Sequence, residues 1–81
     1  MNPIRNPIRV AVIFGPGSRV TPKWFELNHH RHDITTTTYT WKDRIGETPL
    51  VHYAVSDGEA LYELVYNTCD QTWSLNSLQA D

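Results

Sequence analysis

Two short runs of alternating residues flank the dipeptide Asp57-Gly58, and this arrangement constrains the fold more than any other feature of the chain. The first run spans residues 50–55 and the second spans residues 60–66. An Asp-Gly pair between two such runs is the strongest local indication of a β-hairpin. The sequence therefore predicts two antiparallel strands joined by a two-residue turn at positions 57 and 58.

The predicted turn sets a register, which decides the side chains that share each face of the hairpin. One face is apolar and is expected to form the core; it pairs Val55 with Ala60, Tyr53 with Tyr62, and Val51 with Leu64. The other face, which we call the mixed face, pairs Ala54 with Leu61, His52 with Glu63, and Leu50 with Val65. Its apolar residues are too many to be left to water, so we expect a protein partner, a second copy or the N-terminal arm to cover them.

The length and composition indicate one small domain without covalent or metal cross-links. A chain of 81 residues forms a single core, to which the three Trp, four Tyr and two Phe contribute much of the apolar area. Cys69 is the single cysteine, so an internal disulfide is excluded and a reducing cytoplasm is expected. The longest apolar run, Val10 to Phe14, is too short for a signal peptide or a membrane span.

The charges are distributed unevenly along the chain. Residues 1–25 contain four basic residues and no acidic one, which gives +4, whereas residues 26–81 contain three basic and nine acidic residues, which gives −6. Such a basic segment either contacts the acidic body of the protein or binds nucleic acid. We favour contact with the acidic body, because four charges are few.

The remaining patterns complete an all-β chain. Residues 1–7, which contain the repeated tetrapeptide Asn-Pro-Ile-Arg, are expected to form a flexible N-terminal arm, residues 8–78 the β domain and residues 79–81 a tail. Further strands are predicted over residues 8–14, 23–28, 31–42 and 72–78, with a charged loop at 43–48. The fold class is therefore about six antiparallel strands in a meander, forming a strongly twisted sheet or a small open barrel.

The predicted strand at residues 31–42 changes phase along its length. His32 and Ile34 share one parity, whereas Tyr39 and Trp41 share the other. A β-bulge or a bend within the threonines at 35–38 would direct all four side chains toward one core. Such a bend is typical of a barrel corner.

The spacing of several residues along the chain is similar to that of a known protein family. These residues are Pro22, Phe25, Leu27, His32, Ile34, Trp41, Tyr53-x-Val55, Asp57-Gly58, Tyr62-Glu63-Leu64 and Trp73-x-Leu75. In them the chain resembles a bacterial family of small β domains of unknown function, which occur alone or appended to proteins similar to Y-family translesion DNA polymerases. The resemblance covers residues 8–75 and implies a β domain with an accessory role in DNA repair.

No catalytic or metal site is expected. In the segment His29 to Asp33, alternation along a strand separates His30 and His32 from Arg31 and Asp33, so too few ligands converge on a metal ion. His52 and Glu63 form a potential acid/base pair, but no nucleophile motif, phosphate loop or zinc motif accompanies them. We therefore predict a protein that is not an enzyme, with no cofactor and no small-molecule substrate.

Two binding functions remain as hypotheses. The first is a cytoplasmic accessory module that contacts a protein, or a second copy of itself, through the mixed face. The alternative is nucleic-acid binding through Arg19, Lys23 and Trp24, because an aromatic ring beside cations stacks a base and holds a phosphate. If Phe25 and Leu27 face the core, Trp24 points outward, where it either binds a base or covers an edge of the domain.

Overall fold

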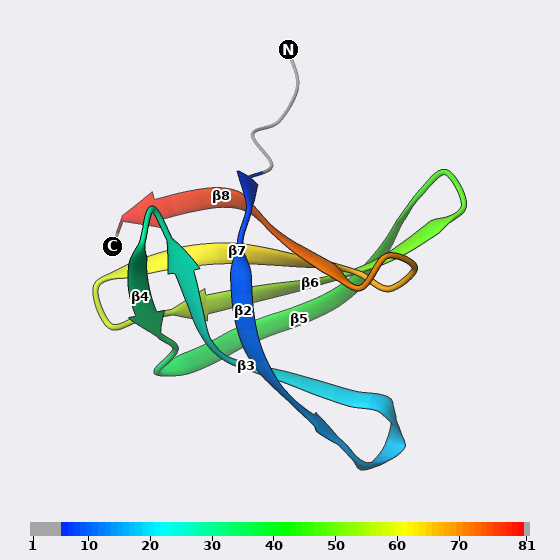
Figure 1. Ribbon diagram of the computed structural model, residues 1–81, viewed down its shortest axis with the longest axis horizontal. Helices are drawn as coiled ribbons and strands as arrows, with labels where there is room; N and C mark the ends of the chain where they lie inside the picture. The colour runs from blue at the N-terminus through cyan, green and yellow to red at the C-terminus, as the bar shows by residue number, and fades with distance from the viewer. Residues whose placement is uncertain (1–5, 81) are drawn as a thin grey trace.

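A computed structural model describes the backbone of residues 6–80, which form eight strands and one 3₁₀ turn, η1 at Pro16–Ser18 (Figure 1). The strands are β1 (Asn6–Pro7), β2 (Arg9–Gly15), β3 (Arg19–Leu27), β4 (His30–Asp33), β5 (Thr36–Ile45), β6 (Thr48–Ser56), β7 (Ala60–Asn67) and β8 (Thr72–Ala80). The predicted all-β class is confirmed. Within this part of the chain, no helix has the length and hydropathy that a bilayer crossing requires.

The strands form two antiparallel sheets. The large sheet has the order β1-β8-β7-β6-β5 and the small sheet has the order β2-β3-β4. The chain passes between the sheets at two corners, one at Ile8 and one at Ile34 and Thr35. At the second corner the N–H of Ile34 donates to Lys23 O at 3.0 Å and the N–H of Thr35 donates to Ser56 O at 2.8 Å. Hydrogen bonding thus continues through the corner, but the sheets do not close into a barrel.

The corner at Ile34 corrects the predicted single strand at residues 31–42. That segment is two strands, β4 and β5, which belong to different sheets. The predicted bulge within the threonines is confirmed, because the pairing of β5 with β6 shifts between Thr37 and Tyr39. The expectation that the bend brings all the large side chains into one core is wrong. Trp41 pairs with His52 and so lies on the outer face of the large sheet.

The hairpin around Asp57 is confirmed, but its register differs from the predicted one. Tyr53 pairs with Leu64 rather than with Tyr62, a shift of two residues. The loop is longer than two residues because Asp57 Oδ1 accepts the backbone N–H groups of Glu59 and Ala60, at 2.8 and 3.0 Å. A shift of two preserves side-chain parity, so the apolar face of the hairpin is the one that the sequence predicts.

The core lies between the two sheets. Its buried members are Phe25, Tyr53, Val55, Tyr62, Leu64, Tyr66 and Leu75. Phe25 of the small sheet has no exposed area, and its ring stacks on His32 with a centroid separation of 5.0 Å. The rings of Phe25 and Tyr62, which is in the large sheet, are arranged edge to face with a centroid separation of 4.9 Å. One phenylalanine therefore joins both layers.

Several boundaries differ from the predicted ones. Of the expected arm, Asn6 and Pro7 pair with β8 as an edge strand, where a proline is tolerated, while residues 1–5 lie outside the described residues. Of the expected tail, residues 79 and 80 belong to β8, and residue 81 lies outside the described residues. The charged loop expected at 43–48 is a two-residue turn, in which Gly46 has a φ of 59°.

Replacing the two phenylalanines by alanine separates core packing from surface exposure. Phe25→Ala is expected to lower the free energy of unfolding by about 3–5 kcal/mol, because it opens a cavity between the sheets. Phe14→Ala serves as the control, because Phe14 is 66% exposed, and is expected to change that free energy by less than about 0.5 kcal/mol. Urea titration followed by tryptophan fluorescence measures both. Equal effects of the two changes would contradict the packing described.

Candidate functional site

Two long hairpins extend toward the same end of the molecule, on the right in Figure 1. One is β2–β3 and the other is β5–β6. A cleft of about 630 Å³ opens between them, which we call the hairpin cleft. Its lining residues are Arg19, Val20, Thr21 and Pro22 of β3, Thr37, Thr40 and Lys42 of β5, Pro49, Val51 and Tyr53 of β6, and Tyr66 and Thr68 at the end of β7.

The floor of the hairpin cleft is a continuation of the core. Tyr53 and Tyr66 are buried, and the ring of Trp73 lies 5.4 Å from the first and 4.7 Å from the second. Burial, and then the neighbouring Tyr66, raises the pKa of Tyr53 above its usual value of 10.0. The Tyr53 phenol is therefore neutral at physiological pH. Val51 beside it packs against the core and adds apolar surface.

Two cations occupy opposite walls of the hairpin cleft. Arg19 lies at the start of β3, and Lys42 lies on β5, where it pairs with Val51 and so shares the inner face of the large sheet. Both side chains are exposed. The lining contains no aspartate, glutamate, histidine or cysteine among the described residues. The lining residues therefore carry net positive charge.

The hairpin tips expose apolar side chains beside this cleft. Ile13 and Phe14, near the tip of β2–β3, are 53% and 66% exposed, and Ile45 at the tip of β5–β6 is 49% exposed. Large apolar side chains at such exposure are unfavourable in water and often mark contact surfaces. None of the three lines the cleft, and by alternation Ile45 shares the outer face of the large sheet with Asp43.

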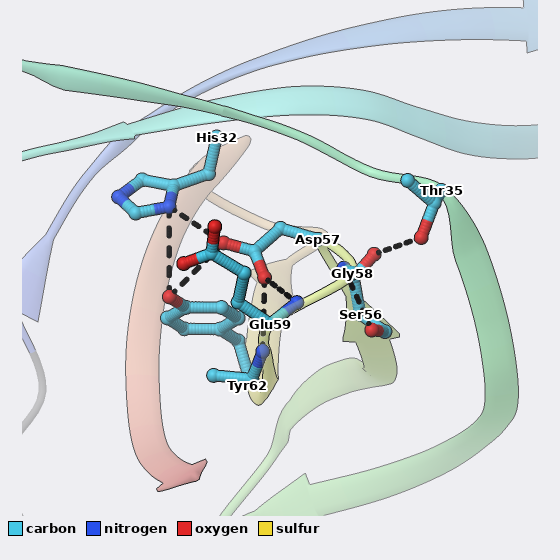
Figure 2. Close-up of polar contacts among 8 residues, drawn as sticks. His32, Thr35, Ser56, Asp57, Gly58, Glu59 and Tyr62 are labelled. Carbon is cyan, nitrogen blue, oxygen red and sulfur yellow. Dashed lines mark hydrogen bonds and ion pairs between the residues drawn. The ribbon is translucent and has the colours of Figure 1, made fainter. Parts of the chain in front are cut away.

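A polar cluster joins the sheets at the opposite end of the molecule, where β4 lies beside the β6–β7 loop (Figure 2). His32 Nδ1 lies 2.9 Å from Asp57 Oδ2, and because a carboxylate only accepts, the imidazole nitrogen donates. The hydroxyl of Tyr62 donates to the same oxygen at 3.2 Å. Asp57 is therefore shared by both sheets and by its own loop, a role beyond the turn that the sequence predicts for it.

These contacts fix the charge of Asp57. The hydrogen bond from His32, with the backbone N–H groups of Glu59 and Ala60 and the hydroxyl of Tyr62, lowers the pKa of Asp57 from 3.8 to about 2, against the opposing effect of burial. Burial and then the negative charge of Asp57 raise the pKa of Tyr62. The cluster thus pairs an ionised Asp57 with a neutral Tyr62, and these contacts stabilise the fold. The ionised carboxylate has no proton to transfer.

The mixed face is largely covered by the chain itself. Leu50, His52 and Val65 are only 2–5% exposed, so they are not available to a partner in this conformation. Trp41 of β5 stacks on His52 with a centroid separation of 4.9 Å and an interplanar angle of 13°. The accessible surface of this face therefore reduces to the half-buried Ala54, Leu61 and Glu63, and a partner is not needed to bury the others.

The expected contact between His52 and Glu63 is present, although the two residues are diagonal neighbours rather than direct partners. His52 Nδ1 donates to Glu63 Oε2 at 2.7 Å, and Asn76 Nδ2 donates to the same oxygen at 2.8 Å. His52 Nε2 lies 3.4 Å from Asp43 Oδ2, within ion-pair distance but without the alignment of a hydrogen bond. Both ring nitrogens face carboxylates, so the ring is held in place by its neighbours and closed to solvent.

The three residues proposed for nucleic-acid binding do not form one patch. Arg19 lines the hairpin cleft, whereas Lys23 and Trp24 do not. Trp24 points outward as expected, but the guanidinium of Arg31 covers its ring at 4.6 Å. Trp24 thus already has a cation on its face and is not open to a stacking base on that side.

The segment from His29 to Asp33 is divided between two surfaces, as its alternation predicts. Arg31 Nε and Asp33 Oδ1 form an exposed ion pair at 2.8 Å on the outer face of the small sheet, whereas His32 faces the core. Among the described residues, no three side chains of His, Cys, Asp or Glu lie close enough together to hold a metal ion.

Comparison of the chain with protein-family models, with curated proteins and with solved structures found no match. The resemblance to the bacterial family of small β domains therefore stays a prediction.

The pH dependence of stability tests the role of Asp57. Because the pKa of Asp57 is lower in the folded protein than in the unfolded chain, its contribution is complete above about pH 4 and is lost as the pH falls toward 2. Asp57, 11% exposed, is expected to contribute about 1–2 kcal/mol at neutral pH. Asp57→Asn should remove this amount and flatten the stability profile between pH 4 and 2 in urea titrations.

The control for this experiment is Glu59→Gln, in the same loop, whose side chain is exposed. It is expected to leave the profile of the wild-type chain unchanged. A profile of Asp57→Asn as steep as that of the wild-type chain between pH 4 and 2 would show that Asp57 is not held ionised by the fold.

Proposed function

We propose that this protein is a non-catalytic binding module that receives a protein partner in the hairpin cleft. The observation that carries the proposal is a cleft of about 630 Å³ with an apolar floor and two cations on its walls. Concave sites with an apolar floor and a few polar groups are the usual form of binding sites. The partner therefore binds at the end of the molecule that the polar cluster leaves open.

The position of the titratable groups supports a role without catalysis. Threonine hydroxyls line the cleft, but no histidine or carboxylate among the lining residues stands beside them to remove a proton. The two histidine–carboxylate pairs, His32 with Asp57 and His52 with Glu63, lie outside the cleft and bind each other. The module therefore acts through contact alone.

The hairpin cleft replaces the mixed face as the proposed contact surface. Three residues of the mixed face are buried in the monomer, whereas Phe14, Ile13 and Ile45 at the tips are about half exposed or more. Contacts near the centre of an interface provide most of the free energy of protein association, and the contacts around them exclude water. A homodimer through the same tips is a form of this proposal, and a cytoplasmic, bacterial setting is part of it.

Nucleic-acid binding in DNA repair is the second candidate function. Arg19 and Lys42 in one cleft without a carboxylate favour an anionic ligand, which includes a phosphate backbone. The aromatic rings of the cleft are less suited to bases, because Tyr53 and Tyr66 are 6% and 8% exposed and contact Trp73. A stacking platform needs an open ring face. We therefore place protein binding first.

Site-specific photo-cross-linking tests the proposal in cells of the organism that encodes the protein. A photoreactive benzoylphenylalanine in place of Thr40, in the wall of the cleft, is expected to form adducts of discrete mass with a protein. Thr36 is the matched control, because it is exposed on the same strand and does not line the cleft. Adducts are identified by mass spectrometry. Adducts with nucleic acid alone, equal adducts from both positions, or none from Thr40 would contradict the proposal.

A further inference from the structure

The two cations of the hairpin cleft, unlike Arg9 and Arg31, have no carboxylate beside them in the described part of the chain. Arg9 lies 3.4 Å from Glu26, and Arg31 lies 2.8 Å from Asp33. Among the described residues, no carboxylate lies within ion-pair distance of Arg19 or Lys42. The charge of the cleft is therefore not neutralised within the protein.

The acidic neighbour of Lys42 in the sequence does not change this. Asp43 follows Lys42 on β5, but alternation directs its carboxylate to the outer face of the large sheet, where it lies 3.4 Å from His52 Nε2. The sheet therefore separates the charge of Lys42 from that of Asp43. Since the net charge of the whole protein is −2, this positive cleft is a local feature rather than a consequence of composition.

The other lining residues indicate that the ligand of the cleft has apolar and hydrogen-bonding groups as well as negative charge. Val20, Pro22, Pro49 and Val51 give the cleft apolar walls, and four threonines supply hydroxyl groups that donate and accept hydrogen bonds. An extended peptide has the matching parts, because its side chains alternate in direction and its backbone offers both donors and acceptors. A cleft of about 630 Å³ lies within the size range of ligand sites and holds only a short segment.

We propose that the segment bound in the hairpin cleft is an extended acidic peptide, in which carboxylates pair with Arg19 and Lys42 and intervening apolar side chains contact the cleft walls. This inference rests on the proposed function and adds the chemistry of the partner. Arg19 presents a planar fork suited to a carboxylate, and Lys42 on the opposite wall presents a compact charge. The two walls thus select for acidic residues that are separated along the peptide.

Fluorescence anisotropy with labelled ten-residue peptides and the full chain tests the inference. The probes have one design, with Val or Leu alternating with Glu, with Gln or with Lys. The Glu peptide is expected to bind at least tenfold more tightly than the Gln peptide in 50 mM salt, and the Lys peptide not to bind. Raising the salt to 200 mM should weaken binding of the Glu peptide severalfold, because exposed ion pairs are screened.

Charge removal locates the binding site. Arg19→Gln and Lys42→Gln are each expected to weaken binding of the Glu peptide by about two- to fivefold, as for loss of one exposed ion pair. Lys23→Gln is the matched control for Arg19→Gln, because Lys23 is exposed on β3 and does not line the cleft, and it should change binding less than twofold.

Three outcomes would overturn the inference. The first is equal binding of the Glu and Gln peptides, or no binding of either. The second is equal loss in the Arg19→Gln and Lys23→Gln variants. The third is tighter binding of a single-stranded dT12 oligonucleotide than of the Glu peptide, which would assign the cleft to nucleic acid. If Thr40 still forms protein adducts in cells, the first two outcomes leave the proposed function standing and reject only the acidic peptide.

Discussion

The hydrogen bond between His32 and Asp57 fastens the small sheet to the large sheet at one end of the molecule. The carboxylate also holds the β6–β7 loop through two backbone N–H groups, so the loop, the corner and the core meet at one side chain. Phe25 fills the space beside this contact, stacked on His32 and against Tyr62. Because a chain of 81 residues has one small core, the sheets are held together there and diverge at the other end.

The divergence of the sheets accounts for the hairpin cleft. The hairpins β2–β3 and β5–β6 extend away from the polar cluster toward the same end (Figure 1). The inner face of the large sheet is there no longer covered by the small sheet, so residues such as Val51 and Lys42 line an open site. The contact between His32 and Asp57 thus lies at the closed end, whereas Arg19 and Lys42 line the cleft at the open end.

Much of the fold follows from the sequence because it depends on local patterns. The strands around Asp57-Gly58 and the core face that contains Tyr53, Val55 and Leu64 are predicted correctly. The register is not, because the hydrogen bonds of the Asp57 side chain lengthen the loop, and a pattern of alternation is unchanged by a shift of two. The passage of the chain between the sheets at Ile34 is also not predicted by the sequence. The change of phase along residues 31–42 indicates a bend, but it does not indicate which sheet each half joins.

The candidate site depends on packing between sheets and so is mostly absent from the sequence. The sequence predicts Arg19 as a binding residue, but it groups Arg19 with Lys23 and Trp24. In the structure Arg19 shares the cleft with Lys42, which belongs to the other sheet. The alternation along β5 is one sequence signal that Lys42 lies in the cleft. Lys42 shares a face with Thr40, and Thr40 is paired with the core residue Tyr53. On the mixed face, His52 is covered by Trp41, which the phase change of β5 places over the imidazole ring.

A double-mutant cycle between His32 and Asp57 tests most directly whether one contact joins the two sheets. His32→Phe keeps an aromatic ring against Phe25 but removes the donor, and Asp57→Asn removes the charge. The free energies of unfolding of the wild-type chain, both single variants and the double variant should give a coupling of about 1–2 kcal/mol. Effects that add to within about 0.3 kcal/mol would show that the sheets are held together by other contacts, and would contradict the account.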